Sequence, residues 1–416
     1  MYMSNWDVNF GEVADHFLEL CVRDAQCASK FLAVGLRNTV DEVVKGNGAY
    51  MRCGWHLKSS SATTFTSLVN NALGMLLMRS RTRAAIPALA LRLYRCSYDD
   101  VRALRVFMDA FVDSLVAPSE EDAFGSSLLY YLIVFSEMWE VPTPTASVLT
   151  SRFANATMST GPIASMFPSY CRFTQDNSSA CSSYVSSSRF ASPRAPAVPI
   201  AYKKDKYWNK AATIPADASV LILSGKLDPQ TPHKYAERLL AALDGPAARK
   251  ELVTFDYSEH GTLFATKLPD AVPGSATCGM MVLASYVRGS GDLSKLDKSC
   301  VKSLTMSFKL SKKDALLMFN TTDAYDGEFV FASSDDAQDE TEERYLTPFV
   351  VLLALAVVLG VAIGAMYWKK RRAARAAQAA KDEDALPQPA TEEESEVAAS
   401  PSATDSQYIA AEEARV

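Results

Sequence analysis

The chain has 416 residues, 48% of them apolar, and a formal net charge of -6 at pH 7. This length suffices for one large domain or two ordinary ones, and the apolar fraction is ordinary for a globular protein. Because nucleic-acid binding needs a basic surface, the slight negative charge argues against it, and we expect no nucleic-acid partner.

Residues 1–213 are predicted to form a mainly helical region. Apolar residues recur at helical spacing in GEVADHFLELC, in the stretch 68–78, in RAAIPALALRLYRC and in the stretch 101–116. Pro87 lies early in the third of these runs, where the first turn of a helix tolerates it. A helical array in front of the segments described next suits a lid or cap.

Residues 214–310 are predicted to form an α/β part. The run Val220–Leu223 is continuously apolar, as in a parallel strand buried on both faces, and the loop after it carries Asp228. A second strand, predicted over 252–257, is followed by His260. The two polar residues are 32 positions apart, which is the length of one strand–helix–strand unit. Adjacent parallel strands therefore bring both side chains to one rim of the sheet.

Asp228 and His260 are the residue types that activate a nucleophilic serine. The imidazole accepts the proton of the hydroxyl, and the carboxylate holds the imidazole in one tautomer. In α/β-hydrolases the order along the chain is serine, acid, histidine, with the serine on a G-x-S-x-G elbow. The sequence has no such elbow, since its only glycines four apart, Gly360 and Gly364, have Ala362 between them. We predict that Asp228 and His260 are catalytic and that the serine precedes residue 1; either residue alone would be an ordinary loop residue.

These two motifs resemble the C-terminal part of the α/β-hydrolase serine exopeptidases of the prolyl and tripeptidyl aminopeptidase group, known as the TAP-like C-terminal domain. In that group the acid lies in a G-x-x-D-x-x-T-P context and the histidine in an H-G context, matched here by GKLDPQTP and by HG at His260. The resemblance spans residues 5–305. It implies the C-terminal part of an α/β-hydrolase sheet with a helical cap, and hydrolysis of peptides from the free N-terminus through a serine acyl-enzyme, without a cofactor.

The resemblance also implies where the substrate's ammonium group binds. An acid of the cap has this role in the exopeptidases, and Glu137, after the strand-like apolar run in LLYYLIVFSEMWE, matches its place. Asp122 and Glu140 are further candidates. A surface acid near a helix end is the alternative interpretation of Glu137.

Eight cysteines, an even number, fit an oxidised secretory ectodomain, with unpaired buried thiols as the alternative. No C-x-x-C pair or His/Cys cluster indicates zinc, so we expect no metal. The resemblance implies disulfides for the first and last of three pairs that lie close in sequence; these pairs are Cys21 and Cys27, Cys171 and Cys181, and Cys278 and Cys300. Glycosylation sequons at Asn155, Asn177 and Asn320 point to the same compartment.

Residues 345–368 are uncharged, long enough to cross a bilayer as a helix, and followed by four cationic residues. A buried core helix is the alternative. We predict a single-pass type I membrane protein with an extracellular or luminal ectodomain, an acidic stalk over 311–344 and a disordered cytoplasmic tail over 369–416. The spacing of Gly360 and Gly364 allows a weak homodimer through the membrane helix. Residues 1–20 lack the apolar segment of a signal peptide, so we also expect the protein to extend upstream.

The prediction that combines these features is a membrane-anchored serine exopeptidase whose partners are a peptide substrate and the membrane. We expect the 416 residues to lack hydrolytic activity without a serine elbow, because removing the serine of a triad abolishes most of its rate enhancement. Two alternatives remain: a non-catalytic ectodomain that binds a partner, and an ester hydrolase, since the same triad serves acyl transfer generally.

Overall fold

The computed structural model describes residues 1–330 apart from 46–47, 49, 55, 58–61, 117–125, 162, 188–198, 203, 270 and 273, and these residues belong to one compact unit. The predicted membrane span, residues 345–368, and the predicted tail, residues 369–416, lie outside the described residues. In the described part of the chain, no helix combines the length and the apolar character that a bilayer crossing requires.

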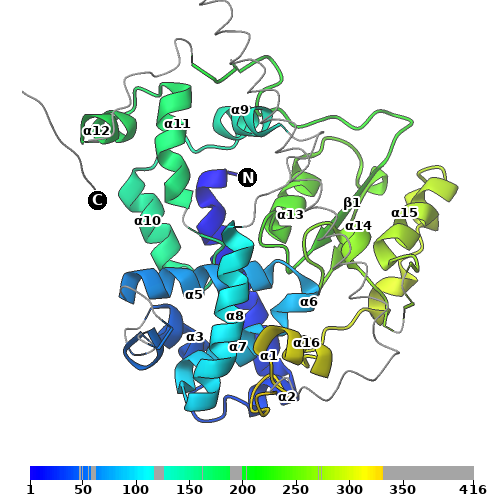
Figure 1. Cartoon of the computed structure of the whole chain (residues 1–416). Helices are drawn as coiled ribbons and strands as arrows, with labels where there is room; N and C mark the ends of the chain where they lie inside the picture. The colour runs from blue at the N-terminus through cyan, green and yellow to red at the C-terminus, as the bar shows by residue number, and fades with distance from the viewer. Residues whose placement is uncertain are drawn as a thin grey trace, which may run out of the picture. The chain divides into compact units, whose positions relative to one another are not determined.

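The first half of the chain is helical, in agreement with its apolar periodicity (Figure 1). The α-helices are α1 (Trp6–Arg23), α2 (Ala25–Ser29), α3 (Leu36–Val44), α5 (Ala62–Leu77), α6 (Ser80–Arg83), α7 (Ile86–Arg95), α8 (Tyr98–Val116), α9 (Ser127–Glu137), α10 (Ala146–Asn155), α11 (Phe167–Thr174) and α12 (Ser179–Ser187). The tighter or wider turns are η1 (Met3–Asn5), η2 (Tyr50–Gly54) and η3 (Ile163–Met166).

A hydrophobic core joins α1, α3, α5, α7 and α8. On α1 the helical period places Val13, Phe17, Leu18 and Cys21 on one face, and all four are buried. Burial of a Leu or Phe side chain stabilises a fold by about 1.5–3 kcal/mol. This stripe therefore holds α1 against the other helices of the core.

The apolar run before Glu137 is a helix, α9, and the strand-like interpretation of this run is wrong. Ser126 caps the helix, because its Oγ accepts a hydrogen bond from the amide of Leu129 at 3.2 Å. Val134 and Phe135 are buried, whereas Leu128 and its neighbours are exposed. The polar cap and the exposure of most of the run favour the helix over a buried strand.

The α/β part contains two strands, β1 (Val220–Gly225) and β2 (Lys250–Phe255), joined through α13 (His233–Ala242). The strands pair in parallel, with Val220 opposite Lys250 and Gly225 opposite Phe255. The predicted parallel strand–helix–strand unit is thereby confirmed. The remaining elements of this part are η4 (Ala247–Arg249), α14 (Thr262–Ala265), α15 (Cys278–Arg288), η5 (Leu293–Lys295) and η6 (Ser299–Ser303).

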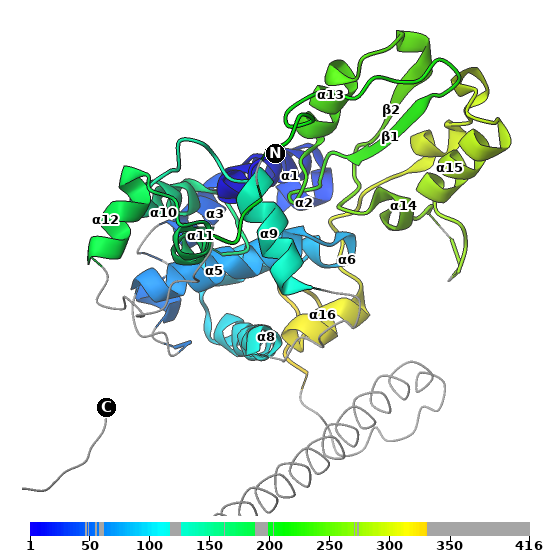
Figure 2. The ribbon, with the colours of Figure 1, turned by 90° about the horizontal axis from the view of Figure 1, so that it is seen from above.

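Helices cover the two faces of the sheet: β1 and β2 lie between α13 and α15 (Figure 2). On the α15 side, Val253 and Phe255 of β2 pack with Cys278 and Val282 in a small separate core. The prediction of a β1 strand buried on both faces is wrong for 220–223, which are half-buried. The described sheet has only two strands, so neither strand is enclosed on both edges.

The segment predicted as the beginning of a stalk belongs to the folded unit. Residues 312–319 form α16, which packs against α8 (Figure 1). Phe319 is fully buried, and Arg92 of α7 donates a hydrogen bond from Nε to the carbonyl of Ala324 at 2.7 Å. Buried aromatic and arginine contacts outweigh the polar composition here, so the stalk prediction is wrong for 312–330. Residues 331–344 lie outside the described residues.

Four disulfides cross-link the described residues and leave no free cysteine among them. The three cysteine pairs that lie close in sequence are all present as disulfides, Cys21–Cys27, Cys171–Cys181 and Cys278–Cys300. The fourth disulfide joins Cys53 to Cys96, which follows α7, and sequence reasoning proposed no partner for either residue. Their separation of 43 residues hides the pairing until α7 and η2 are placed side by side.

Candidate functional site

Asp228 lies in the tight turn that follows β1, and its side chain is buried. The amides of Gln230 and Thr231 each donate a hydrogen bond to its Oδ1 at 2.9 Å. The hydroxyl of Thr231 donates to Oδ2 at 2.6 Å. An ionised carboxylate only accepts hydrogen bonds, so this set of donors matches the charged form and fixes the direction of Oδ2.

His260 lies after β2 and just before α14, and its Nδ1 is 2.9 Å from Oδ2 of Asp228. Because the carboxylate accepts, Nδ1 carries the proton and donates it in this pair. The imidazole is 48% exposed, and in the described part of the chain its Nε2 has no hydrogen-bond partner. The structure thus brings together the two predicted residues and leaves the second ring nitrogen open.

A close backbone approach holds the two loops together. The amide of Leu227 donates a hydrogen bond to the carbonyl of Ser258 at 3.0 Å. The amide of Lys226 donates to the carbonyl of Phe255, also at 3.0 Å. A Cβ on Gly225 would lie 2.2 Å from the oxygen of Ser258, closer than any side chain tolerates. Glycine at 225 is therefore what permits the Asp228 loop and the His260 loop to meet.

The arrangement can hold an imidazole in one tautomer and accept a proton at Nε2. A buried carboxylate at Nδ1 prevents ring flipping and stabilises the cation that forms when Nε2 takes a proton. This is the chemistry that a hydroxyl nucleophile needs. The catalytic roles of Asp228 and His260 stay predictions.

Thr231 is part of this site, although the sequence placed it only in the T-P context that follows the acid. Helix α13 begins at His233 with Pro232 at its N-cap position and without a side-chain cap. The hydroxyl of Thr231 instead binds Asp228 and lies 3.1 Å from Nδ1 of His260. The T-P context after the acid was the available signal, because a threonine three residues after an aspartate can bond back to it.

The three acids proposed for the ammonium group of a substrate have different surroundings. Glu137 is exposed at the end of α9, and the described part of the chain offers it no ion-pair partner. Glu140 is ion-paired with Arg152. Burial raises the pKa of Glu140, but hydrogen bonds from Arg152 and Ser4 outweigh it and lower the pKa. Asp122 lies outside the described residues.

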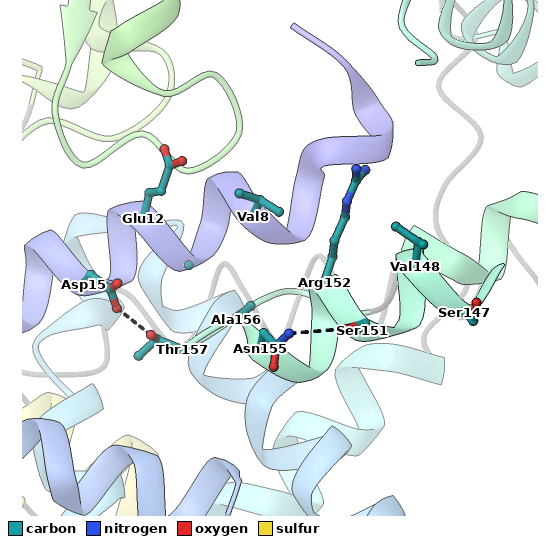
Figure 3. Close-up of a pocket in the computed structure, with 11 residues that line it drawn as sticks. Val8, Glu12, Asp15, Ser147, Val148, Ser151, Arg152, Asn155, Ala156 and Thr157 are labelled. Atoms are coloured by element: carbon teal, nitrogen blue, oxygen red, sulfur yellow. Dashed lines mark hydrogen bonds between the residues drawn. The ribbon is translucent and has the colours of Figure 1, made fainter. Parts of the chain in front are cut away.

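A cavity of about 600 Å³ lies between α1 and α10 (Figure 3). Neither Asp228 nor His260 lines it. The predicted glycosylation residue Asn155 does, and its Nδ2 donates to Oγ of Ser151 at 3.2 Å. Thr157 of the same sequon is buried, and its hydroxyl donates to the carboxylate of Asp15. The carboxylate of Asp15 and the hydroxyl of Thr157 are thus engaged with each other.

The other two sequons differ in exposure. Asn177 is exposed between α11 and α12. Asn320 is half-buried at the end of α16, and its Nδ2 donates to the carbonyl of Val330 at 2.8 Å. Glycosylation of these asparagines stays a prediction.

Metal binding has no support among the described residues, where no three His, Cys, Asp or Glu side chains cluster. The expectation that the protein needs neither a metal nor a cofactor stays a prediction.

Residues 187–300 match the model of a family described as TAP-like protein, and this match relates that part of the chain to the α/β-hydrolases. The matched residues include Asp228 and His260. No curated protein and no solved structure matches the chain. The match gives the general α/β-hydrolase relationship and does not single out one group of exopeptidases.

Proposed function

We propose, from the relationship of residues 187–300 to the α/β-hydrolases, that Asp228 and His260 are the acid and the general base of a serine hydrolase. The observation that carries the proposal is the 2.9 Å contact between Nδ1 of His260 and Oδ2 of Asp228 at the ends of two parallel strands. Its position agrees with the rule that catalytic groups lie beyond the carboxyl ends of such strands.

The reaction follows from the protonation states of this pair. A serine oxygen attacks the substrate carbonyl, and its proton moves to Nε2 of His260, while Asp228 stabilises the imidazolium. When the carbon–nitrogen bond breaks, Nε2 returns the proton to the leaving amine. Water then attacks the acyl-serine by the same route and regenerates the hydroxyl. No metal or redox partner is needed to balance these steps.

The nucleophile in this proposal precedes Asp228 in the chain order that α/β-hydrolases use. No serine of the 416 residues lies in a G-x-S-x-G context. We propose that the serine belongs to a longer form of the protein, N-terminal to these residues. The same missing motif favours the second candidate, a hydrolase-like ectodomain that binds a partner without catalysis.

The substrate we propose is a peptide with a free N-terminus. The resemblance of the two motifs to prolyl and tripeptidyl aminopeptidases supports this choice over simple esters. Glu137 supports it too, because an exposed carboxylate without an ion-pair partner in the described part of the chain is available for an ammonium group.

The location we propose is the lumen or exterior of a membrane, with a single anchor over residues 345–368. The four disulfides support an oxidising compartment. The uncharged sequence of 345–368 and the cationic residues after it support the anchor and its orientation.

Labelling with a fluorophosphonate tests the proposal, because this reagent modifies only an activated serine. The coding sequence upstream of Met1 is read first, and the longer form is expressed beside the 416-residue chain. We expect labelling of the longer form at an elbow serine, its loss in His260→Gln, and no labelling of the 416-residue chain. Labelling of the shorter chain at a mapped serine contradicts the upstream nucleophile.

Substrate panels then separate the alternatives. Peptides with free and with acetylated N-termini and matched esters are compared on the longer form, with Glu137→Gln beside wild type. The exopeptidase predicts cleavage of free peptides only, with a higher KM in the variant. Preference for esters supports an ester hydrolase, and an upstream sequence without an elbow serine supports the binding ectodomain.

A further inference from the structure

Arg83 connects the helical region to the loop that carries His260. It ends α6, and its side chain is 2% exposed. Its Nη2 donates to the carbonyl of Tyr257 at 2.9 Å and to Oε2 of Glu259 at 3.0 Å. Glu259 directly precedes His260. One guanidinium thus holds both the backbone and a side chain of this loop.

The ion pair between Arg83 and Glu259 carries a large desolvation penalty for a contact that only joins two segments. Glu259 is also buried, so both charges are removed from water. Nε and Nη1 of Arg83 have no hydrogen-bond partner in the described part of the chain, and such orphan donors are unfavourable. A buried ion pair of this kind is seldom more stabilising than apolar side chains of the same volume. Stability alone therefore does not explain the pair.

Arg83 nevertheless keeps its charge. Burial lowers the pKa of Arg83 to about 10, although the carboxylate of Glu259 opposes the change. The guanidinium is therefore protonated at neutral pH and continues to donate to both acceptors.

His260 depends on the position of its backbone. Its imidazole is half-exposed, and among the described residues it has hydrogen bonds only at Nδ1, so its outer side is not held by a hydrogen bond. On one side, the bond from Leu227 to the carbonyl of Ser258 ties the loop to the Asp228 turn. Arg83 ties the same loop on the other side. A shift of the loop would move Nδ1 away from Asp228.

We propose that Arg83 and Glu259 are positioning residues that set His260 against Asp228, so that the packing of α6 on this loop controls the alignment of the acid and the base. Their importance for catalysis rests on the proposed function, but the alignment itself does not. Neither side chain hydrogen-bonds to the imidazole in the described part of the chain, so neither is catalytic.

The alignment is measured without any hydrolysis. The 416-residue chain contains four histidines, so labelling them with ¹⁵N gives a sparse spectrum in which the Nδ1 proton of His260 is followed directly. The variants are Arg83→Met, Glu259→Gln and the double variant R83M/E259Q. Arg81→Met is the matched control, because Arg81 lies on the same helix but is exposed and pairs with Asp314.

We expect the Nδ1 proton of His260 to exchange with water about tenfold faster or more in Arg83→Met and in the double variant, the factor that one lost charged hydrogen bond corresponds to. The double variant, which buries no unpaired charge, is expected to unfold near the wild-type urea concentration. Signals of His16 and His233 stay unchanged, as do all signals in Arg81→Met. Arg83→Lys keeps the positive charge and is expected to restore part of the slow wild-type exchange of the Nδ1 proton.

A folded double variant with the wild-type His260 signal overturns the proposal. If both Arg83 variants fail to fold, Glu259→Gln decides. Loss of the charge that accepts from Arg83 is expected to raise the His260 exchange rate in this variant too, and an unchanged rate overturns the proposal. In the longer form, loss of kcat with an unchanged KM separates positioning from substrate binding. Absence of hydrolysis in that form contradicts the proposed function alone, because the alignment is read independently.

Discussion

Thr231 and Asp228 are joined twice, through the hydroxyl of Thr231 at 2.6 Å from Oδ2 and through its amide at 2.9 Å from Oδ1. The same Oδ2 accepts the hydrogen bond from His260. A residue three positions beyond the acid therefore determines how the carboxylate faces the base. The structure assigns Thr231 a role that its position before a helix conceals.

Replacement of Thr231 by valine removes the hydroxyl and keeps the β-branched shape. We expect the free energy of unfolding to fall by about 1.5–3 kcal/mol, the usual worth of a hydrogen bond to a charged group. Urea unfolding measures this loss. Thr231→Ser retains the hydroxyl and serves as the control. Equal stability of the valine variant and wild type would show that the hydroxyl contributes nothing.

Asp7 predicts a pH dependence of stability. Burial raises its pKa to about 6, against hydrogen bonds from Ser159 and Ile163 that lower it. The folded protein thus binds more protons than the unfolded chain between the ordinary aspartate pKa of 3.8 and about 6. Below this window, Asp7 makes its full contribution to the free energy of unfolding. This contribution, about 3 kcal/mol in all, is lost as the pH rises through about 6.

The measurement compares urea unfolding of wild type and Asp7→Asn across this window. We expect the difference in free energy of unfolding between the two proteins to shift against wild type as the pH rises. A constant offset from the changed hydrogen bonds does not affect this slope. Parallel pH profiles for the two proteins would sink the prediction.

The disulfide between Cys53 and Cys96 is expected to stabilise the protein more than that between Cys21 and Cys27. The separations are 43 and 6 residues, and the longer loop restricts the unfolded chain more. Loop-closure entropy predicts about 4 kcal/mol for the first and about 2 kcal/mol for the second. Paired alanine variants, compared by thermal unfolding, test the order, which a larger loss for the short loop would contradict.

The sequons are expected to differ in occupancy. Asn177 is exposed, whereas the amide of Asn320 is used in a hydrogen bond to Val330, which a glycan would remove. After expression through a secretory pathway, we expect Asn177→Gln to reduce an endoglycosidase-dependent mass shift that Asn320→Gln leaves unchanged. Peptide mapping supplies the assignment. A glycan found at Asn320 of the folded protein is the contrary result.

Sequence patterns gave correct predictions where all the residues concerned lie within one short stretch of the chain. The helical period of α1 predicted which face is buried, and the strand-end positions of Asp228 and His260 predicted their meeting. Patterns failed where distant residues decide. Residues 312–330 fold because Arg92 and the helical core receive them. The apolar run before Glu137 is a different case, because the cap that marks it as a helix, Ser126, lies beside it in the sequence.

The sequence by itself determined the types and order of the candidate acid and base and the parallel strand–helix–strand unit that brings them together. These depend on spacing along a single stretch of chain. Only the tertiary structure decided the orientation of His260, the part that Thr231 takes in the site, the partner of Cys53, and the tie from Arg83 to Glu259. The last two join residues far apart in sequence, and the Thr231 and His260 contacts depend on the exact path of two loops, which packing sets and spacing does not encode.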